Sequence, residues 1–231
     1  MAETSRATVL KDRDGVGSAR PVTPLEGFPK KLADRLNRKL PGADAHLRFA
    51  PHIPRVGDYH SPAPNARPAA VVALLYRKKG VWHVPLTLRP DDISQHAGQI
   101  CFPGGRVEEN ETLEEAALRE LREELGPISR VRVIGTLTPF YVFVSRHLVT
   151  PHVAITPVCP TFVPEPREVA ELLEVPLFHL LDPHQVVTTR ITVRDTSFET
   201  PGIRFGPHFI WGATCMMLSE LVTVVRDVLS D

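Results

Sequence analysis

The sequence is poor in cysteine and in aromatic residues, and it carries no net charge. Its 231 residues include three cysteines, and 6% are Phe, Trp or Tyr. An odd number of cysteines without paired spacing argues against a disulfide framework and favours a reducing compartment. Because 27 Lys and Arg balance 27 Asp and Glu, no global field attracts nucleic acid or an anionic membrane, and we expect neither partner.

Long apolar stretches are also missing. No uninterrupted apolar run is long enough to span a bilayer, and the N-terminal residues show no secretory signal. We therefore expect a cytoplasmic protein. The apolar share of 42% is enough to bury the core of one domain that carries an extension.

The pattern along the chain predicts two parts. Residues 1–66 read as a tail, a short helix at 28–40 and a Pro-rich connector, and residues 67–231 as the main domain. The main domain mixes strands and helices without strict alternation, which indicates an α+β fold or an α/β fold with a mixed sheet. We expect strands at 69–76, 81–88, 131–142, 149–159, 190–194 and 203–211, and helices at 113–125, 176–182 and from 212 onward.

The helix at 113–125 has clear ends. Thr112 with Glu115 three residues later is typical of a capping box, and Gly126 stands where a helix C-terminal glycine belongs. Before it, Gly104 and Gly105 permit a tight turn and close approach to a ligand. An apolar stripe faces the core and consists of Leu113, Ala117, Leu118, Leu121 and Leu125.

The same helix carries a second face of carboxylates. Glu120, Glu123 and Glu124 share this face at helical spacing. Clustered carboxylates repel unless a cation neutralises them, and their hard oxygens suit Mg²⁺ or Mn²⁺. Arg119 lies four residues before Glu123 and also within reach of Glu111. The alternative is a solvated helix surface with ordinary charges, and the glycine turn with Glu111 argues against it.

The run from Gly105 to Gly126 resembles the Nudix box, Gly-x5-Glu-x7-Arg-Glu-Leu-x-Glu-Glu-x-Gly. Every charged and glycine position of the pattern is filled, and Pro127 departs from the usual aliphatic residue. The resemblance implies an α/β/α sandwich around a mixed β-sheet, here with an N-terminal helical extension. It implies four metal ligands, Glu120, Glu123, Glu124 and the Gly105 carbonyl, and a structural pair, Glu111 and Arg119.

The likeness continues outside the box. Residues 86–89 (LTLR) and 98–105 (GQICFPGG) are similar to the motif of coenzyme A pyrophosphatases, and so are residues 40–42 and 210–214. The similarity covers about residues 30–228. Ser94 departs from it, because the motif has Arg at this position.

The resemblance implies a Mg²⁺-dependent hydrolase, with Mn²⁺ as a possible substitute. It would cleave a diphosphate linkage in a nucleoside diphosphate derivative, with coenzyme A or an acyl-CoA giving 4′-phosphopantetheine and 3′,5′-ADP. Substrate contacts are expected at Arg89, Gly104 and Gly105. Glu124 is one candidate for the general base, and the loop glutamates are the others, namely Glu165, Glu168 and Glu171; we count Glu168 among the catalytic residues.

Two other readings stay open. An ADP-ribose or nucleotide-sugar diphosphatase would share the chemistry, and Ser94 favours this substrate change. A catalytically silent ligand-binding module of Nudix type is the alternative of another class, but such a module would be expected to lose its metal carboxylates. The N-terminal extension could cover a sheet edge or mediate a homodimer.

Overall fold

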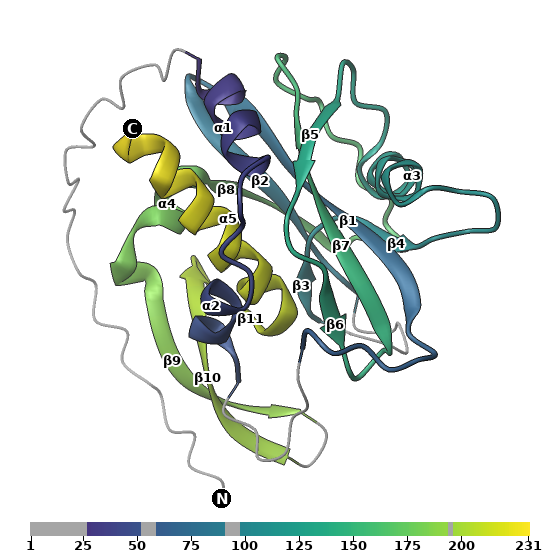
Figure 1. Ribbon diagram of the computed structural model, residues 1–231, viewed down its shortest axis with the longest axis vertical. Helices are drawn as coiled ribbons and strands as arrows, with labels where there is room; N and C mark the ends of the chain where they lie inside the picture. The colour runs from purple at the N-terminus through teal and green to yellow at the C-terminus, as the bar shows by residue number, and fades with distance from the viewer. Residues whose placement is uncertain (1–26, 52–58, 91–97, 194–195) are drawn as a thin grey trace, which may run out of the picture.

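A mixed β-sheet lies between helices on its two faces (Figure 1). The structure, a computed structural model, describes residues 27–51, 59–90, 98–193 and 196–231. The strands of the main sheet are β1 (Arg67–Lys78), β2 (Val81–Leu88), β3 (Ile100–Cys101), β4 (Gly104–Arg106), β5 (Arg132–Thr136), β6 (Phe140–Val142), β7 (His147–Ile155) and β8 (Glu171–Pro176). A smaller antiparallel sheet contains β9 (Val186–Val193), β10 (Thr196–Phe205) and β11 (His208–Trp211).

Five α-helices and two short 3-10 turns complete the described chain. The helices are α1 (Phe28–Leu36), α2 (Ala43–His46), α3 (Leu113–Leu125), α4 (Leu177–Leu181) and α5 (Gly212–Ser230), and the 3-10 turns are η1 (Leu47–Phe49) and η2 (Pro183–Gln185). None of the described helices is long and apolar enough to cross a membrane.

Strand β1 organises the main sheet. It runs parallel to β7 and antiparallel to β2 and β4, so the sheet is mixed. Successive side chains of a strand point to opposite faces, and β1 is buried on both. Ala70, Val72, Leu74 and Tyr76 pack toward α3, whereas Ala69, Ala73 and Leu75 join the core that α1 and α5 complete. The expected sandwich of helices around a mixed sheet is confirmed.

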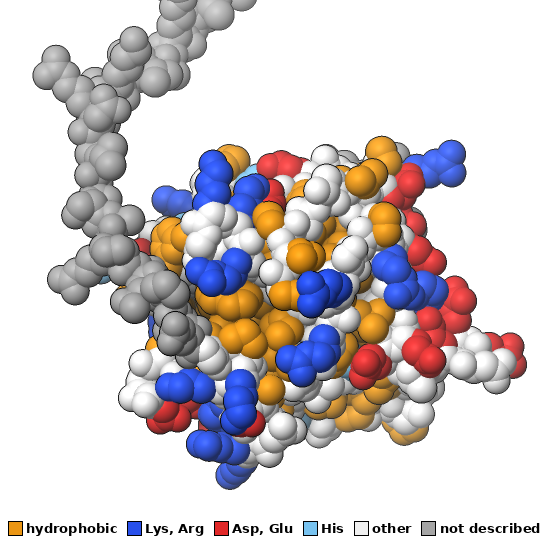
Figure 2. Space-filling model, turned by 90° about the horizontal axis from the view of Figure 1, so that it is seen from above, with side chains coloured by type: hydrophobic (Ala, Val, Ile, Leu, Met, Phe, Trp, Pro, Cys, Tyr) orange, Lys and Arg blue, Asp and Glu red, His pale blue; other side chains and the backbone are white. Residues whose placement is uncertain are grey.

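Charge is balanced over the chain but unevenly distributed on the face that Figure 2 shows. In the view of Figure 2, acidic side chains gather mainly on the side of the molecule where α3 lies, and Lys and Arg spread over the rest of that face. This segregation concentrates the carboxylates around the helix that the sequence singled out.

Several expected elements differ at their ends. The expected strand 131–142 is divided into β5 and β6, because Pro139 between them has no N–H for a ladder. The expected strand 203–211 is a hairpin, since Gly206, at φ 58°, turns the chain between β10 and β11. Strand β8 was not predicted at all, and its six residues pair with β2.

The N-terminal helix α1 belongs to the main core. Phe28, Leu32 and Leu36 are buried in the same cluster as the α5 side chains, and Arg35 forms an ion pair with Asp227 of α5 at 2.7 Å. Gly135 allows this approach, because a Cβ there would meet the Leu36 Cβ at 2.8 Å. The division at residue 66 therefore does not separate two cores, and as a domain boundary it stays a prediction.

Candidate active site

Helix α3 is fixed at both ends by local hydrogen bonds. Thr112 Oγ1 accepts from the Glu115 N–H at 3.2 Å, and the Glu115 carboxylate accepts from the Thr112 N–H at 2.9 Å. At the other end Gly126, at φ 79°, stops the helix. The predicted capping box and C-terminal glycine are confirmed, and they set which residues face the sheet.

The buried face of α3 differs slightly from the predicted stripe. Ala117, Leu121 and Leu125 are buried as expected, but Leu113 is 37% exposed and Ala116 is buried. Glu124 also lies on the buried face, with 1% of its surface exposed. A carboxylate is thus held against the apolar core of the sheet.

Arg119 connects the loop before α3 to the carboxylates on the helix. It donates to both oxygens of Glu111, at 2.9 and 3.0 Å, to Glu120 at 3.0 Å and to Glu123 at 2.8 Å. The Arg119 guanidinium holds the pKa of Glu111 below its usual value. A further hydrogen bond from Arg119 to the Arg106 carbonyl, at 3.0 Å, ties strand β4 to the helix.

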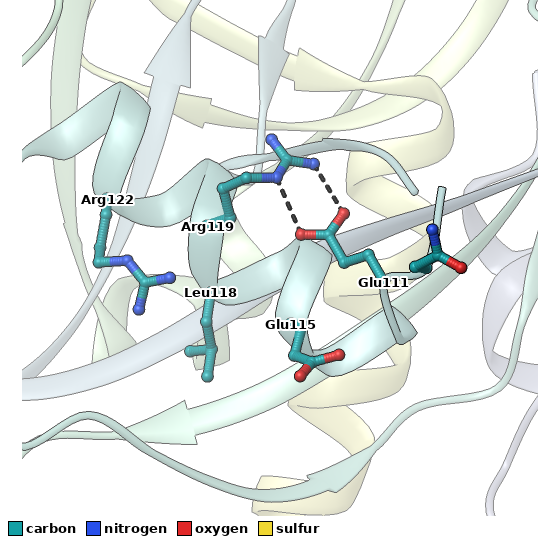
Figure 3. A pocket seen from close by; sticks show the side chains of 6 residues that line it. Glu111, Glu115, Leu118, Arg119 and Arg122 are labelled. Carbon is teal, nitrogen blue, oxygen red and sulfur yellow. Dashed lines mark hydrogen bonds and ion pairs between the residues drawn. The ribbon is translucent and has the colours of Figure 1, made fainter. Parts of the chain in front are cut away.

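An open hollow of about 380 Å³ lies beside this pair. Figure 3 shows the Glu111–Arg119 pair at its edge, with the side chains of Glu115, Leu118 and Arg122 around it. The hollow's lining does not include the inner carboxylates of α3. It therefore lies on the loop side of the helix and not at the place where those carboxylates meet.

Three carboxylates meet on the inner side of α3. One oxygen each of Glu120, Glu124 and Glu168 lies within 4.8 Å of the other two. Glu124 is fully buried, and Glu120 and Glu168 are half-buried. This trio (the carboxylate cluster) has the donor atoms and density that a hard divalent cation requires.

Main-chain hydrogen bonds bring Glu168 to the cluster. The N–H of Val163 donates to the Leu125 carbonyl, and the N–H of Glu165 donates to the Glu124 carbonyl, both at 2.9 Å. Further along, the N–H of Ala170 donates to the Leu88 carbonyl at 2.8 Å. The segment before β8 is thereby fastened to the end of α3 and to the end of β2.

The protein environment raises the pKa values of Glu120 and Glu124. Burial raises the pKa of Glu124 to about 7, although the Gly104 N–H at 3.3 Å, the Arg89 charge and the Thr87 hydroxyl at 3.2 Å favour the ionised form. Burial also raises the pKa of Glu120, against the opposing effect of Arg119. A bound cation would relieve both penalties, since it favours the charged forms.

The sequence predicted a turn at Gly104 and Gly105, but both lie in strand β4, where the packing leaves no space for a side chain. Gly104 has φ 153°, and a Cβ there would overlap the main chain of Ala70 and Val71. A Cβ on Gly105 would overlap the carboxylate of Glu120. The missing side chains let β4 lie against β1 and leave room for the cluster.

Arg89 lies beside the cluster at the end of β2. Its main chain pairs with Gln99 and Gly98, and its charge acts on Glu124. The Arg89 Nε is buried and has no hydrogen-bond partner within the described ranges. Arg89 as a whole is partly buried, and a guanidinium nitrogen without a partner is suited to binding an anionic oxygen.

The structure thus brings together some of the glutamates that were predicted as metal ligands or catalytic residues, and leaves others apart. Glu120, Glu124 and Glu168 converge next to Gly105, whereas the Glu123 side chain is 52% exposed and bonds to Arg119. Glu165 and Glu171 do not belong to the carboxylate cluster of the described residues. Ser94 lies outside the described residues.

Sequence reasoning missed one residue of the site, Thr87. Its hydroxyl donates to Glu124, and its side chain is 1% exposed. The signal was its place in the LTLR segment two residues before Arg89, but only the fold shows that β2 ends against α3.

Comparisons with known proteins agree with the geometry. Residues 66–197 match the family described as NUDIX domain. The chain is 32% identical over 200 residues to the protein named Uncharacterized Nudix hydrolase NudL of Yersinia pestis (strain Pestoides F). The aligned residues cover 86% of this chain and 95% of that relative. The protein of the same name from Yersinia pseudotuberculosis serotype O:3 (strain YPIII) gives the same values.

Two solved structures are among those with a likeness to this chain. The MutT protein from Methanosarcina mazei Go1 has 21% identity and a TM-score of 0.47, over 71% of this chain and 98% of that one. RenU, a Nudix hydrolase from M. smegmatis, has 19% identity and a TM-score of 0.45, over 75% and 96%.

The family match spans more than half of the chain, and it contains strand β4 with Gly104 and Gly105, helix α3 and the segment with Glu168. The chain belongs to the Nudix hydrolase family and is a pyrophosphatase that acts on nucleoside diphosphate derivatives.

Proposed function

We propose that this Nudix hydrolase cleaves the diphosphate of coenzyme A into 4′-phosphopantetheine and 3′,5′-ADP, or that of an acyl-CoA into S-acyl-4′-phosphopantetheine and 3′,5′-ADP. The convergence of Glu120, Glu124 and Glu168 supports the hydrolytic part of the proposal. The substrate rests on the likeness of residues 86–89 and 98–105 to the coenzyme A pyrophosphatase motif.

The residues present fit a divalent cation. Glu120 and Glu124 would hold it, together with the Gly105 carbonyl, and Mg²⁺ suits these hard oxygen donors, with Mn²⁺ as a substitute. When bound, the ion would neutralise charge on the diphosphate and polarise its phosphorus–oxygen bonds. Burial raises the pKa of Glu124, and a bound cation would offset this effect because it favours the ionised carboxylate.

The protein groups then divide the remaining work. Glu168 comes from outside the helix, and its carboxylate would accept the proton of the attacking water. Arg89, with its buried and unpartnered Nε, would bind a phosphoryl oxygen. Gly104 lets β4 lie against β1, and Gly105 leaves room for the Glu120 carboxylate. The bare backbone of these two residues would let the diphosphate approach closely.

Glu123 stands apart from the other ligands that the family box implies. Its carboxylate accepts a 2.8 Å hydrogen bond from Arg119, so it must leave this ion pair to reach a cation. We therefore expect Glu124→Gln to reduce kcat by about 100-fold or more, the scale of losing a metal contact. Glu123→Gln should reduce kcat less.

A second substrate class is favoured by one observation. Ser94 replaces the arginine of the coenzyme A motif, and a lost guanidinium removes a phosphate contact. ADP-ribose or a nucleotide sugar is the alternative substrate.

A panel assay separates the two proposals. The protein would be incubated with Mg²⁺ and coenzyme A, ADP-ribose, NADH, UDP-glucose, diadenosine polyphosphates or nucleoside triphosphates, and the products separated by chromatography. Dominant release of 4′-phosphopantetheine, lost in Glu124→Gln, is the expected result. Faster cleavage of ADP-ribose or a nucleotide sugar would contradict the coenzyme A assignment while keeping the metal site.

We also propose that the protein is cytoplasmic and forms a homodimer. The three cysteines, Cys101, Cys159 and Cys215, are all free, which agrees with a reducing compartment such as the cytoplasm. The predicted homodimer is tested by the mass of the purified protein in light scattering, where a value near 25.7 kDa would contradict it.

A further inference from the structure

A side-chain contact joins the small sheet to the edge of the active site. His208, the first residue of β11, lies with its Nε2 at 3.1 Å from Oε1 of Glu171, the first residue of β8. The His208 side chain is 17% exposed and that of Glu171 is 52% exposed. The contact is a hydrogen bond, and it becomes an ion pair when His208 is protonated.

Glu171 ends the segment that carries Glu168. In the ladder Glu171 stands opposite Leu88 of β2, next to Arg89. The segment's start, at Val163 and Glu165, is bonded to the end of α3. Its end is bonded to β2 through Ala170, and His208 adds a side-chain contact from a third element.

The hairpin that carries His208 is well supported. Ile203 and Ile210 stand opposite each other on β10 and β11, and both are buried. His179 of α4 bonds to the Arg204 carbonyl at 2.6 Å and packs its ring on Phe205. Because the hairpin tip is held in this way, His208 is a fixed point against which the Glu168 segment can be placed.

We propose that His208 is a positioning residue for the hydrolytic reaction. By bonding Glu171 it holds the end of the segment 163–171, and so keeps the Glu168 carboxylate in the cluster with Glu120 and Glu124. The inference rests on the role that the proposed function gives to Glu168. The small sheet of β9, β10 and β11 would then contribute to the reaction from outside the Nudix box, by positioning Glu168.

The test compares His208→Ala and His208→Gln with a matched control. Gln keeps an N–H donor on a side chain of similar reach. The control is Glu199→Gln, which breaks the Arg190–Glu199 ion pair (3.8 Å) in the same small sheet between two exposed side chains. For each protein, kcat and KM would be measured at saturating Mg²⁺ on the panel compound that is cleaved fastest, and amide hydrogen exchange followed over residues 163–171.

His208→Ala should lower kcat about two- to fivefold, the scale of a partly exposed ion pair, with KM unchanged. It should also speed exchange in the segment 163–171, whereas His208→Gln and Glu199→Gln stay near the wild type. A His208→Ala protein that matches Glu199→Gln in both readouts would overturn the inference. So would faster exchange with unchanged kcat, because the contact would then be structural only.

The two proposals fail in different ways. If coenzyme A is not the fastest substrate, the proposed function fails, and the kcat comparison on the other compound still decides the role of His208. If coenzyme A is cleaved and His208→Ala leaves kcat unchanged, only the inference about His208 fails.

Discussion

At the scale of single residues, the site depends on what is missing as much as on what is present. Gly105 has no side chain at the point where the Glu120 carboxylate lies. Glu124 is an ionisable group in an almost fully buried position, where its charged form is stable only with hydrogen bonds and a compensating charge. The space at Gly105 and the buried carboxyl group of Glu124 both agree with a cation-binding site.

We predict that Gly105→Ala lowers activity without unfolding the protein. The new Cβ would displace the Glu120 carboxylate, and moving a group that orients a metal site costs about 10- to 100-fold in affinity or activity. The half-activating Mg²⁺ concentration should rise while the far-ultraviolet circular dichroism spectrum stays unchanged. An unchanged Mg²⁺ requirement would show that Glu120 does not need this space.

At the scale of elements, α3 is a helix whose two ends are set by local residues. The capping box at Thr112 and Glu115 closes its first turn, and Gly126 ends it. Gly126 also leaves space for the chain to return, since a Cβ there would meet Val163 at 3.0 Å. The end of the helix and the docking of the Glu168 segment are therefore linked.

We predict that Thr112→Ala lowers the free energy of unfolding by about 1 kcal/mol, the usual value of an N-cap. For a chain of this size that corresponds to a fall in Tm of about 2–4 °C. Thr112→Ser keeps the hydroxyl acceptor and is the control. Equal melting temperatures for the Ala and Ser proteins would mean that the cap contributes nothing.

The contrast between α3 and β8 explains what sequence analysis can reach. The bounds of α3 follow from residues within it, so they were predicted residue for residue. Strand β8 forms because β2, more than 80 residues earlier, offers it an edge, and no pattern within its six residues shows this. For the same reason three loop glutamates were candidates, and only the bonds from Val163, Glu165 and Ala170 select Glu168.

At the scale of the whole molecule, a buried polar network joins the N-terminal and C-terminal parts. Glu220 of α5 accepts hydrogen bonds from the Gly42 N–H at 2.8 Å, from the His46 ring at 3.0 Å, and from Thr138 at 2.6 and 3.0 Å. Glu220 and His46 are both fully buried. The network connects α2, the β5–β6 connection and α5.

The network makes stability depend on pH. Burial alone would raise the pKa of Glu220, but the bonds from His46 and Thr138 outweigh it and hold the pKa below the ordinary value of 4.5. A lowered folded pKa gives stability that is present above the unfolded value and is lost as pH falls through the folded value. The stabilising effect of Glu220 should therefore be complete near pH 7 and decline in acid below about pH 4.5.

Urea unfolding of wild type and Glu220→Gln at pH 7 and pH 4 measures this effect. Glu220→Gln should be clearly less stable at pH 7, and the difference from wild type should shrink at pH 4. Asp227→Asn, which alters the half-exposed ion pair with Arg35, is the control on the same helix. A difference between wild type and Glu220→Gln of the same size at both pH values would contradict the account.

Most directly testable is the proposal that Glu120 and Glu124 hold the catalytic cation. Mn²⁺ binding, followed by electron paramagnetic resonance, tests it most directly in wild type, Glu120→Gln and Glu124→Gln, with the exposed Glu114→Gln of the same helix as control. We expect one class of tight Mn²⁺ sites in wild type and in Glu114→Gln, and binding weakened about tenfold or more when either Glu120 or Glu124 is replaced. Equal Mn²⁺ affinity in all four proteins would contradict it.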